Sequence, residues 1–260
     1  MKQSLHFASI LVLVLFSALI GWLSESLYAN NPPELLVKLV YYDLSLLTVA
    51  LPIGLIAFIF SLFNNQGARL FTLGWTIYIV FSFVVTLFTS YQNNLFLVYI
   101  AIITLGGFYF IHGLSDFKLR LSGILHRKAA KLISIALLFS AVIGMGFWMS
   151  DAINALSHPD KNLHVKTPQV LDMAFILPFT VYGAIKLWQN KPIGIWISAT
   201  VMVFFVLIGL SVITMEIGLV VKTGAELDAG KVYGFAFTAA LNLIIMILTY
   251  TKLTISTQRP

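Results

Sequence analysis

Eight uninterrupted apolar segments constrain the fold of this chain more than any other feature of its sequence. They occupy residues 7–24, 43–63, 70–90, 94–114, 132–150, 170–188, 193–215 and 232–250. Runs of about 17 to 23 apolar residues match a hydrocarbon layer about 30 Å thick, crossed by a helix that rises about 1.5 Å per residue. A strand of a membrane barrel would instead alternate apolar and polar residues over about ten positions. The sequence therefore predicts an all-α integral membrane protein with about eight transmembrane helices.

The composition leaves little material for a water-soluble domain. Of the 260 residues, 59% are hydrophobic and 10% are charged, against about 45–50% and 25% in ordinary soluble domains. We expect residues 1–260 to form one transmembrane domain, with halves 1–114 and 132–260 joined by a basic segment at 115–131. That segment is either a cytoplasmic loop or an amphipathic helix lying along the inner surface. The chain has no cysteine, which excludes disulfides, thiol nucleophiles and thiolate metal sites.

The charges between the segments predict the orientation in the membrane. With the N-terminus inside, eleven Lys and Arg residues fall on the cytoplasmic side and five fall outside, as the positive-inside rule requires. Nine of the ten acidic residues fall outside, and Asp116 is the exception. Both termini are therefore predicted to be cytoplasmic. The basic residues flank apolar segments and form no stripe with interleaved aromatics, so they indicate contact with lipid headgroups and not with nucleic acid.

The first apolar segment has a second interpretation, as a secretory signal peptide. Lys2 precedes it, and the small residues Ser24 and Ser26 follow it where a cleavage site would lie. Cleavage would leave seven helices and an external N-terminus. The apolar run is longer than the usual signal core of about 7–15 residues, which favours a transmembrane helix.

Short motifs in the first half recur in the second half. The sequence Trp22-Leu23-Ser24-Glu25 corresponds to Trp148-Met149-Ser150-Asp151. Each motif precedes a loop with prolines and then an apolar segment that has an aspartate at its start and a proline inside it: Asp43 and Pro52, or Asp172 and Pro178. The pattern predicts a parallel four-plus-four repeat about an axis along the membrane normal, as in some transporters. Chance matching in a biased composition is the alternative.

Four carboxylates form the candidate ligand-binding site. Under the repeat, Glu25, Asp43, Asp151 and Asp172 would face one another at the outer boundary of the membrane. Such an acidic vestibule could bind a cation or an amine. The alternative is that Asp43 and Asp172 only cap helix N-termini, where a carboxylate contributes about 0.3–1 kcal/mol.

Three classes of function fit these features. The leading hypothesis is a non-enzymatic protein without a cofactor that binds or transports a small cationic or amphiphilic solute at the vestibule. The second is a metal-assisted hydrolase that acts on lipid at the outer leaflet, with His158, His164 and Asp172 as metal ligands. Six positions separate the two histidines, which is not a recognised ligand spacing and favours ordinary loop histidines. The third is an accessory subunit whose lipid-embedded faces bind a membrane protein partner.

Three sites carry a resemblance to a known family. They are Tyr42-Asp43-Leu44 with Pro52, the sequence NLFLVY at 94–99, and the sequence PQVLD at 168–172 with Leu177-Pro178. At these sites the chain resembles a family of multi-pass bacterial membrane proteins that have no assigned function. The resemblance covers the second to the seventh apolar segments. It implies a location in the bacterial plasma (inner) membrane, but it implies no activity and no site residue.

Overall fold

The computed structural model describes residues 2–63, 65–116, 125–157 and 166–257, and all its regular elements are helical. The first half contains α1 (Lys2–Leu23), η1 (Glu25–Tyr28), α2 (Pro33–Ser45), η2 (Leu46–Ala50), α3 (Leu51–Leu62), α4 (Gln66–Thr89) and α5 (Phe96–Asp116). The second half contains α6 (Arg127–Ser157), α7 (Thr167–Leu171), η4 (Asp172–Ile176), α8 (Leu177–Trp188), α9 (Pro192–Thr223) and α10 (Ala229–Thr257). These described residues hold eight helical stretches long and apolar enough to cross a membrane, which confirms the predicted fold class.

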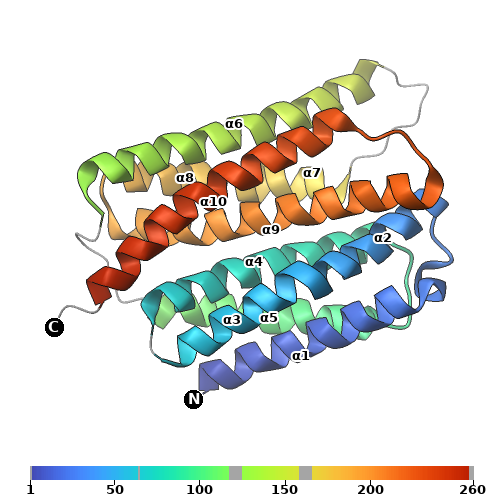
Figure 1. Cartoon of the computed structure of the whole chain (residues 1–260), viewed down its shortest axis with the longest axis horizontal. Helices are drawn as coiled ribbons and strands as arrows, with labels where there is room; N and C mark the ends of the chain where they lie inside the picture. Colours follow the sequence, from blue (N-terminus) through green and yellow to red (C-terminus); the bar gives the residue numbers. More distant parts are fainter. Residues whose placement is uncertain (1, 64, 117–124, 158–165, 258–260) are drawn as a thin grey trace.

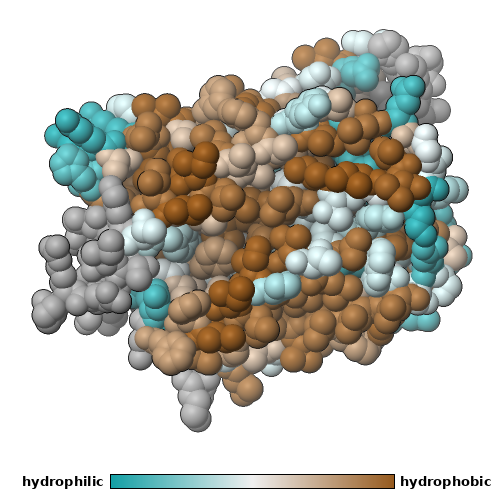
Figure 2. All heavy atoms as spheres, viewed as in Figure 1, coloured by the Kyte–Doolittle hydropathy of each residue, from teal (hydrophilic) through white to brown (hydrophobic). Residues whose placement is uncertain are grey.

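The helices lie side by side in one elongated bundle. Figure 1 shows α1 to α5 on one side and α6 to α10 on the other, with both ends of the chain at the same end of the bundle. Apolar residues dominate the middle of the visible surface, and hydrophilic residues gather at its two ends (Figure 2). Large apolar side chains of the membrane-spanning helices, such as Phe60 and Ile244, are more than half exposed. A surface of this kind fits lipid and not water as the surrounding solvent.

The second and sixth spans begin earlier than the sequence predicts. Pro33 and Pro168 stand in the first turns of α2 and α7, where proline is favoured because its missing N–H is not needed. Asp43 therefore lies well inside a helix that starts at Pro33, and Asp172 follows the whole of α7. The interpretation of these two aspartates as N-terminal caps is wrong, because the residues ahead of each aspartate are already helical and belong to the same span.

A π-helical turn interrupts each of these two spans just before a proline. In η2 the N–H of Leu51 donates to the carbonyl of Leu46, five residues back, and Pro52 follows. In η4 the N–H of Leu177 donates to the carbonyl of Asp172, and Pro178 follows. A proline inside a helix lacks the N–H and clashes with the carbonyl four residues back. The wider π turn accommodates this defect without ending the helix.

Helices α4 and α9 form the centre of the bundle. In its most apolar window, α9 has 83% of its residues buried and α4 has 67%, more than any of the other six spans of the described chain. Gly74 of α4 lies against the backbone of Thr200 in α9, and the rings of Phe81 and Phe204 meet edge to face at 5.0 Å. The two halves of the chain therefore pack against each other along this pair, as small residues permit in membranes.

The first apolar segment packs as part of the bundle, with Phe7, Ile10 and Val14 buried in the core. The basic connection is shorter than the expected 115–131, because α5 continues to Asp116 and α6 begins at Arg127. Most of the stretch in question, residues 117–124, lies outside the described residues.

The α4–α9 contact predicts a test of the packing. A Cβ atom at position 74 would lie 2.5 Å from the carbonyl oxygen of Thr200, a backbone atom that cannot move aside easily. We expect Gly74→Ala to destabilise the protein by about 1–3 kcal/mol, measured as a lower midpoint of thermal unfolding in detergent. Gly107→Ala is the matched control, because nothing lies within 4 Å of its Cβ position. Equal stability of the two variants would contradict this description of the contact.

Candidate functional site

The π turn η4 places Asp172 at the edge of a cavity in the second half. The cavity has a volume of ≈ 70 Å³ and lies between α6, η4, α8, α9 and α10. A cavity needs about 10–15 Å³ by this measure to hold one water molecule. The space beside Asp172 therefore has room for several waters or for one small organic group.

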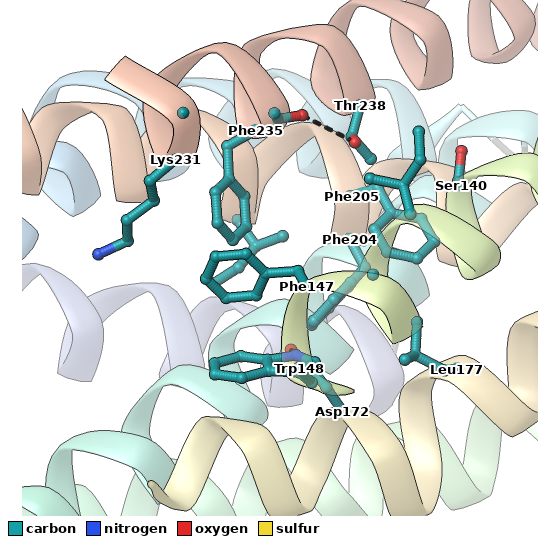
Figure 3. Close-up of a pocket in the computed structure, with 15 residues that line it drawn as sticks. Ser140, Phe147, Trp148, Asp172, Leu177, Phe204, Phe205, Lys231, Phe235 and Thr238 are labelled. Atoms are coloured by element: carbon teal, nitrogen blue, oxygen red, sulfur yellow. Dashed lines mark hydrogen bonds between the residues drawn. The ribbon is translucent and has the colours of Figure 1, made fainter. Parts of the chain in front are cut away.

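Aromatic side chains form much of the wall of this cavity. Figure 3 shows the rings of Phe147 and Phe235 above Trp148, with Asp172 beside the indole. Phe147 meets both Trp148 and Phe235 edge to face, with ring centroids 4.8 Å and 5.8 Å apart. Such contacts hold the rings in fixed orientations. We call Phe147, Trp148, Asp172, Phe204 and Phe235 the aromatic pocket.

The carboxylate of Asp172 has one occupied and one free oxygen. The indole Nε1 of Trp148 donates a hydrogen bond to Oδ2 at 2.8 Å. The side-chain amide of Gln169 donates to the backbone carbonyl of Trp148 at 3.1 Å and helps to fix that residue. From the described part of the chain, Oδ1 receives no hydrogen bond. It is therefore available to a ligand in the cavity.

A lysine also lines the cavity, and its charge is partly compensated. Lys231 extends away from the aromatic rings in Figure 3 and forms an ion pair with Glu216 of α9. Lys38 of α2 lies 3.9 Å from the same carboxylate. Glu216 is buried, with 5% of its surface exposed. The sequence places Glu216 on the outer side but gives no sign of this pairing, because its partners come from two other helices, α2 and α10.

The four predicted carboxylates have four different partners. Glu25 pairs with Lys222 at 3.0 Å and Asp151 pairs with Lys166 at 2.9 Å, and both pairs are partly exposed at the end of the bundle. Exposed ion pairs contribute about 0–1 kcal/mol each. These two acids form a charged rim, whereas the other two lie deeper in the bundle.

Asp43 is buried in the first half, with 3% of its surface exposed. The hydroxyl of Tyr28 donates to its Oδ2 at 2.7 Å and lies 3.3 Å from the hydroxyl of Tyr99. Burial, and secondarily the charge of Asp43, raise the pKa of Tyr28, so the phenol keeps its proton and remains a donor. Gly21 of α1 leaves the room for this pair, because a Cβ there would overlap the Asp43 carboxylate. No pattern in the sequence marks Tyr28, Tyr99 or Gly21 as a site residue, because they come from three separate elements.

The metal hypothesis requires two histidines of the connection between α6 and α7. His158 and His164 lie outside the described residues. Among the residues that are described, no three His, Asp or Glu side chains gather as metal ligands would.

The contact between Tyr28 and Asp43 predicts a loss of stability when the donor is removed. Tyr28→Phe would leave the buried carboxyl of Asp43 without its hydrogen bond from η1, at a cost of about 1–3 kcal/mol. We expect a lower midpoint of thermal unfolding for this variant. Tyr233→Phe is the matched control, because Tyr233 is 72% exposed and should unfold as the unmodified protein does. A Tyr28→Phe variant as stable as that control would show that the hydrogen bond contributes nothing.

Comparisons of the chain with models of protein families, with curated proteins and with solved structures give no match. The geometry of the site is therefore the basis on which a function can be proposed.

Proposed function

We propose that this protein binds a small organic cation inside the membrane, at the aromatic pocket. The observation that carries the proposal is the free Oδ1 of Asp172 beside a cavity walled by Trp148 and phenylalanine rings. Aromatic faces attract ammonium groups by about 0.5–2 kcal/mol each, and more strongly where water is excluded. A carboxylate adds the opposite charge. Quaternary and methylated ammonium ions are the ligands that such sites typically take.

The position of Asp172 supports a functional role over a structural one. An ionisable side chain within a membrane span is costly, and it usually lines a ligand or ion pathway. Asp172 bonds to an uncharged indole and not to a cation, so its charge remains to be neutralised by a ligand or a proton. The exposed pairs of Glu25 and Asp151 at the rim are instead already neutralised.

The irregular turn at Asp172 supports an extension of the proposal from binding to movement across the membrane. A π turn inside a helix is frequently found at a functional site. The π turn η4 and Pro178 form such an irregularity in a continuous span, directly beside the carboxylate. We propose that the cation enters from the end of the bundle where Glu25 and Asp151 lie.

Binding can be tested with tetramethylammonium as the probe. We expect purified protein to bind radiolabelled tetramethylammonium in equilibrium dialysis, at about one cation per chain. Asp172→Asn keeps the shape of the side chain but removes its charge, and it should weaken binding at least about ten-fold, equivalent to about 1.4 kcal/mol. Asp151→Asn is the matched control and should bind as the unmodified protein does, because that carboxylate pairs with Lys166 at the rim.

Two outcomes would contradict the proposal. Folded protein that binds no tetramethylammonium would remove the cation site. Equal binding by Asp172→Asn and Asp151→Asn would move the site away from the aromatic pocket. Movement is a separate question, which uptake of the same probe into proteoliposomes answers.

The proposed location is the bacterial plasma membrane, with both termini in the cytoplasm. The excess of Lys and Arg at the end of the bundle that holds the termini supports this orientation. Because the chain has no cysteine, single cysteines can report it. A membrane-impermeant maleimide applied to intact cells should label Glu226→Cys and leave Gln189→Cys unlabelled until the cells are opened. The reverse pattern would invert the orientation.

A further inference from the structure

Several helical elements of the second half follow elements of the first at a constant spacing of 126 positions. This spacing relates η2 to η4, α3 to α8, and the first residue of α4 to the first residue of α9. It also relates Trp22 to Trp148 and Pro52 to Pro178. Asp43 and Asp172 are 129 positions apart, so matching them to each other shifts the alignment by three residues. In the constant register, Asp172 corresponds to Leu46.

The contacts at the centre of the bundle follow the same register. Gly74 and Thr200, which touch each other, are themselves 126 positions apart. Contact between a residue and its own counterpart is what a two-fold axis between the halves requires. Two apolar grooves on either side of this contact also correspond. One is lined from α4 by Ile77, Val80, Phe81 and Val84, and the other is lined from α9 by Val203, Val206, Leu207 and Leu210.

This register identifies the counterpart of the aromatic pocket in the first half. Trp148 corresponds to Trp22, and Phe147 corresponds to Gly21. Gly21 has no side chain, so the space that corresponds to the Phe147 ring is left for other residues in the first half. The carboxylate of Asp43 and the hydroxyl of Tyr28 fill it, since both contact the Cβ position of Gly21. Asp43 corresponds to Gln169, one helical turn from the position of Asp172 on the same helix face.

Tyr28 occupies this space as a ligand would. It comes from the short 3-10 turn η1 at the end of the bundle, yet only 1% of its surface is exposed. Its hydroxyl is the hydrogen-bond donor to Asp43. Ser17 of α1, which corresponds to the pocket residue Ile143, is also buried, and its hydroxyl lies close to the hydroxyl of Tyr99. The first half thus has a buried carboxylate and buried hydroxyl groups around the ring of Tyr28.

We infer that the first half holds a second site for a small organic cation, with Asp43 as its carboxylate, and that Tyr28 closes this site in the present conformation. The inference rests on the proposed function of the aromatic pocket, from which it takes the class of ligand. Removing the phenol ring would leave the Asp43 carboxylate beside a space of aromatic size, next to the buried cluster of Tyr28, Leu39 and Val40 against which Trp22 packs.

The test is the number of tetramethylammonium ions bound per chain in equilibrium dialysis. Tyr28→Ala should raise this number from about one to about two. Tyr28→Phe is the matched control, because it keeps the ring in place, and it should stay at about one. Adding Asp43→Asn to Tyr28→Ala should return the number to about one. Adding Asp172→Asn to Tyr28→Ala should leave one cation bound at Asp43.

Each outcome decides the inference. Folded Tyr28→Ala protein with no more bound cation than the unmodified protein overturns it. Tyr28→Ser removes the ring but keeps a hydroxyl, and it carries the same expectation where Tyr28→Ala does not fold. Failure of both variants to fold would make Tyr28 a core residue and not a removable occupant, which also overturns the inference. Unmodified protein without bound cation, combined with Asp43-dependent binding by Tyr28→Ala, would reject the aromatic pocket and support the second site.

Discussion

In the hydrocarbon layer no water is present to satisfy peptide N–H and C=O groups, so each span must bond its own backbone. Helices meet this requirement along almost the whole of the described chain. Pro52 and Pro178 lie inside spans and have no N–H for this bonding. Each follows a π turn, whose wider hydrogen-bond pattern accommodates the proline. In the second half this local defect is also what sets Asp172 at the edge of a cavity. A constraint on the backbone therefore determines where a site can form.

The same low polarity divides the carboxylates into two groups. At the end of the bundle, Glu25 and Asp151 pair with lysines and remain partly exposed. Inside it, Asp43 and Asp172 accept hydrogen bonds from the uncharged donors Tyr28 and Trp148. A neutral donor orients a carboxylate but does not cancel its charge. Burying a charged carboxylate costs free energy unless a cation or a proton accompanies it. Asp43 and Asp172 are for this reason the better candidates for binding a cation.

The close contact of Gly74 with Thr200 joins the two halves, and at the spacing of 126 positions that relates these two residues the halves differ in the volume of one side chain. A glycine in one half stands where the other has Phe147. The glycine admits the carboxylate of Asp43 and the phenol of Tyr28, whereas the phenylalanine supplies a wall of the aromatic pocket. The interior around Asp43 is therefore filled by side chains, whereas a cavity remains beside Asp172.

The spans, their number and their helical form follow from the sequence, because the length of an apolar run is a local property that can be compared directly with the thickness of the hydrocarbon layer. The sequence also contains the repeated motifs, but comparing Asp43 with Asp172 gives a register three residues away from that of the helices. The sequence predicts all four candidate acids at one boundary of the membrane, but it does not predict the partners of any of them. Tyr28 is 15 positions from Asp43, Trp148 is 24 from Asp172, and Lys222 is 197 from Glu25. The sequence alone thus determined what crosses the membrane, whereas only the tertiary structure decided which carboxylates are neutralised and which face a cavity, because that depends on contacts between helices far apart in the chain.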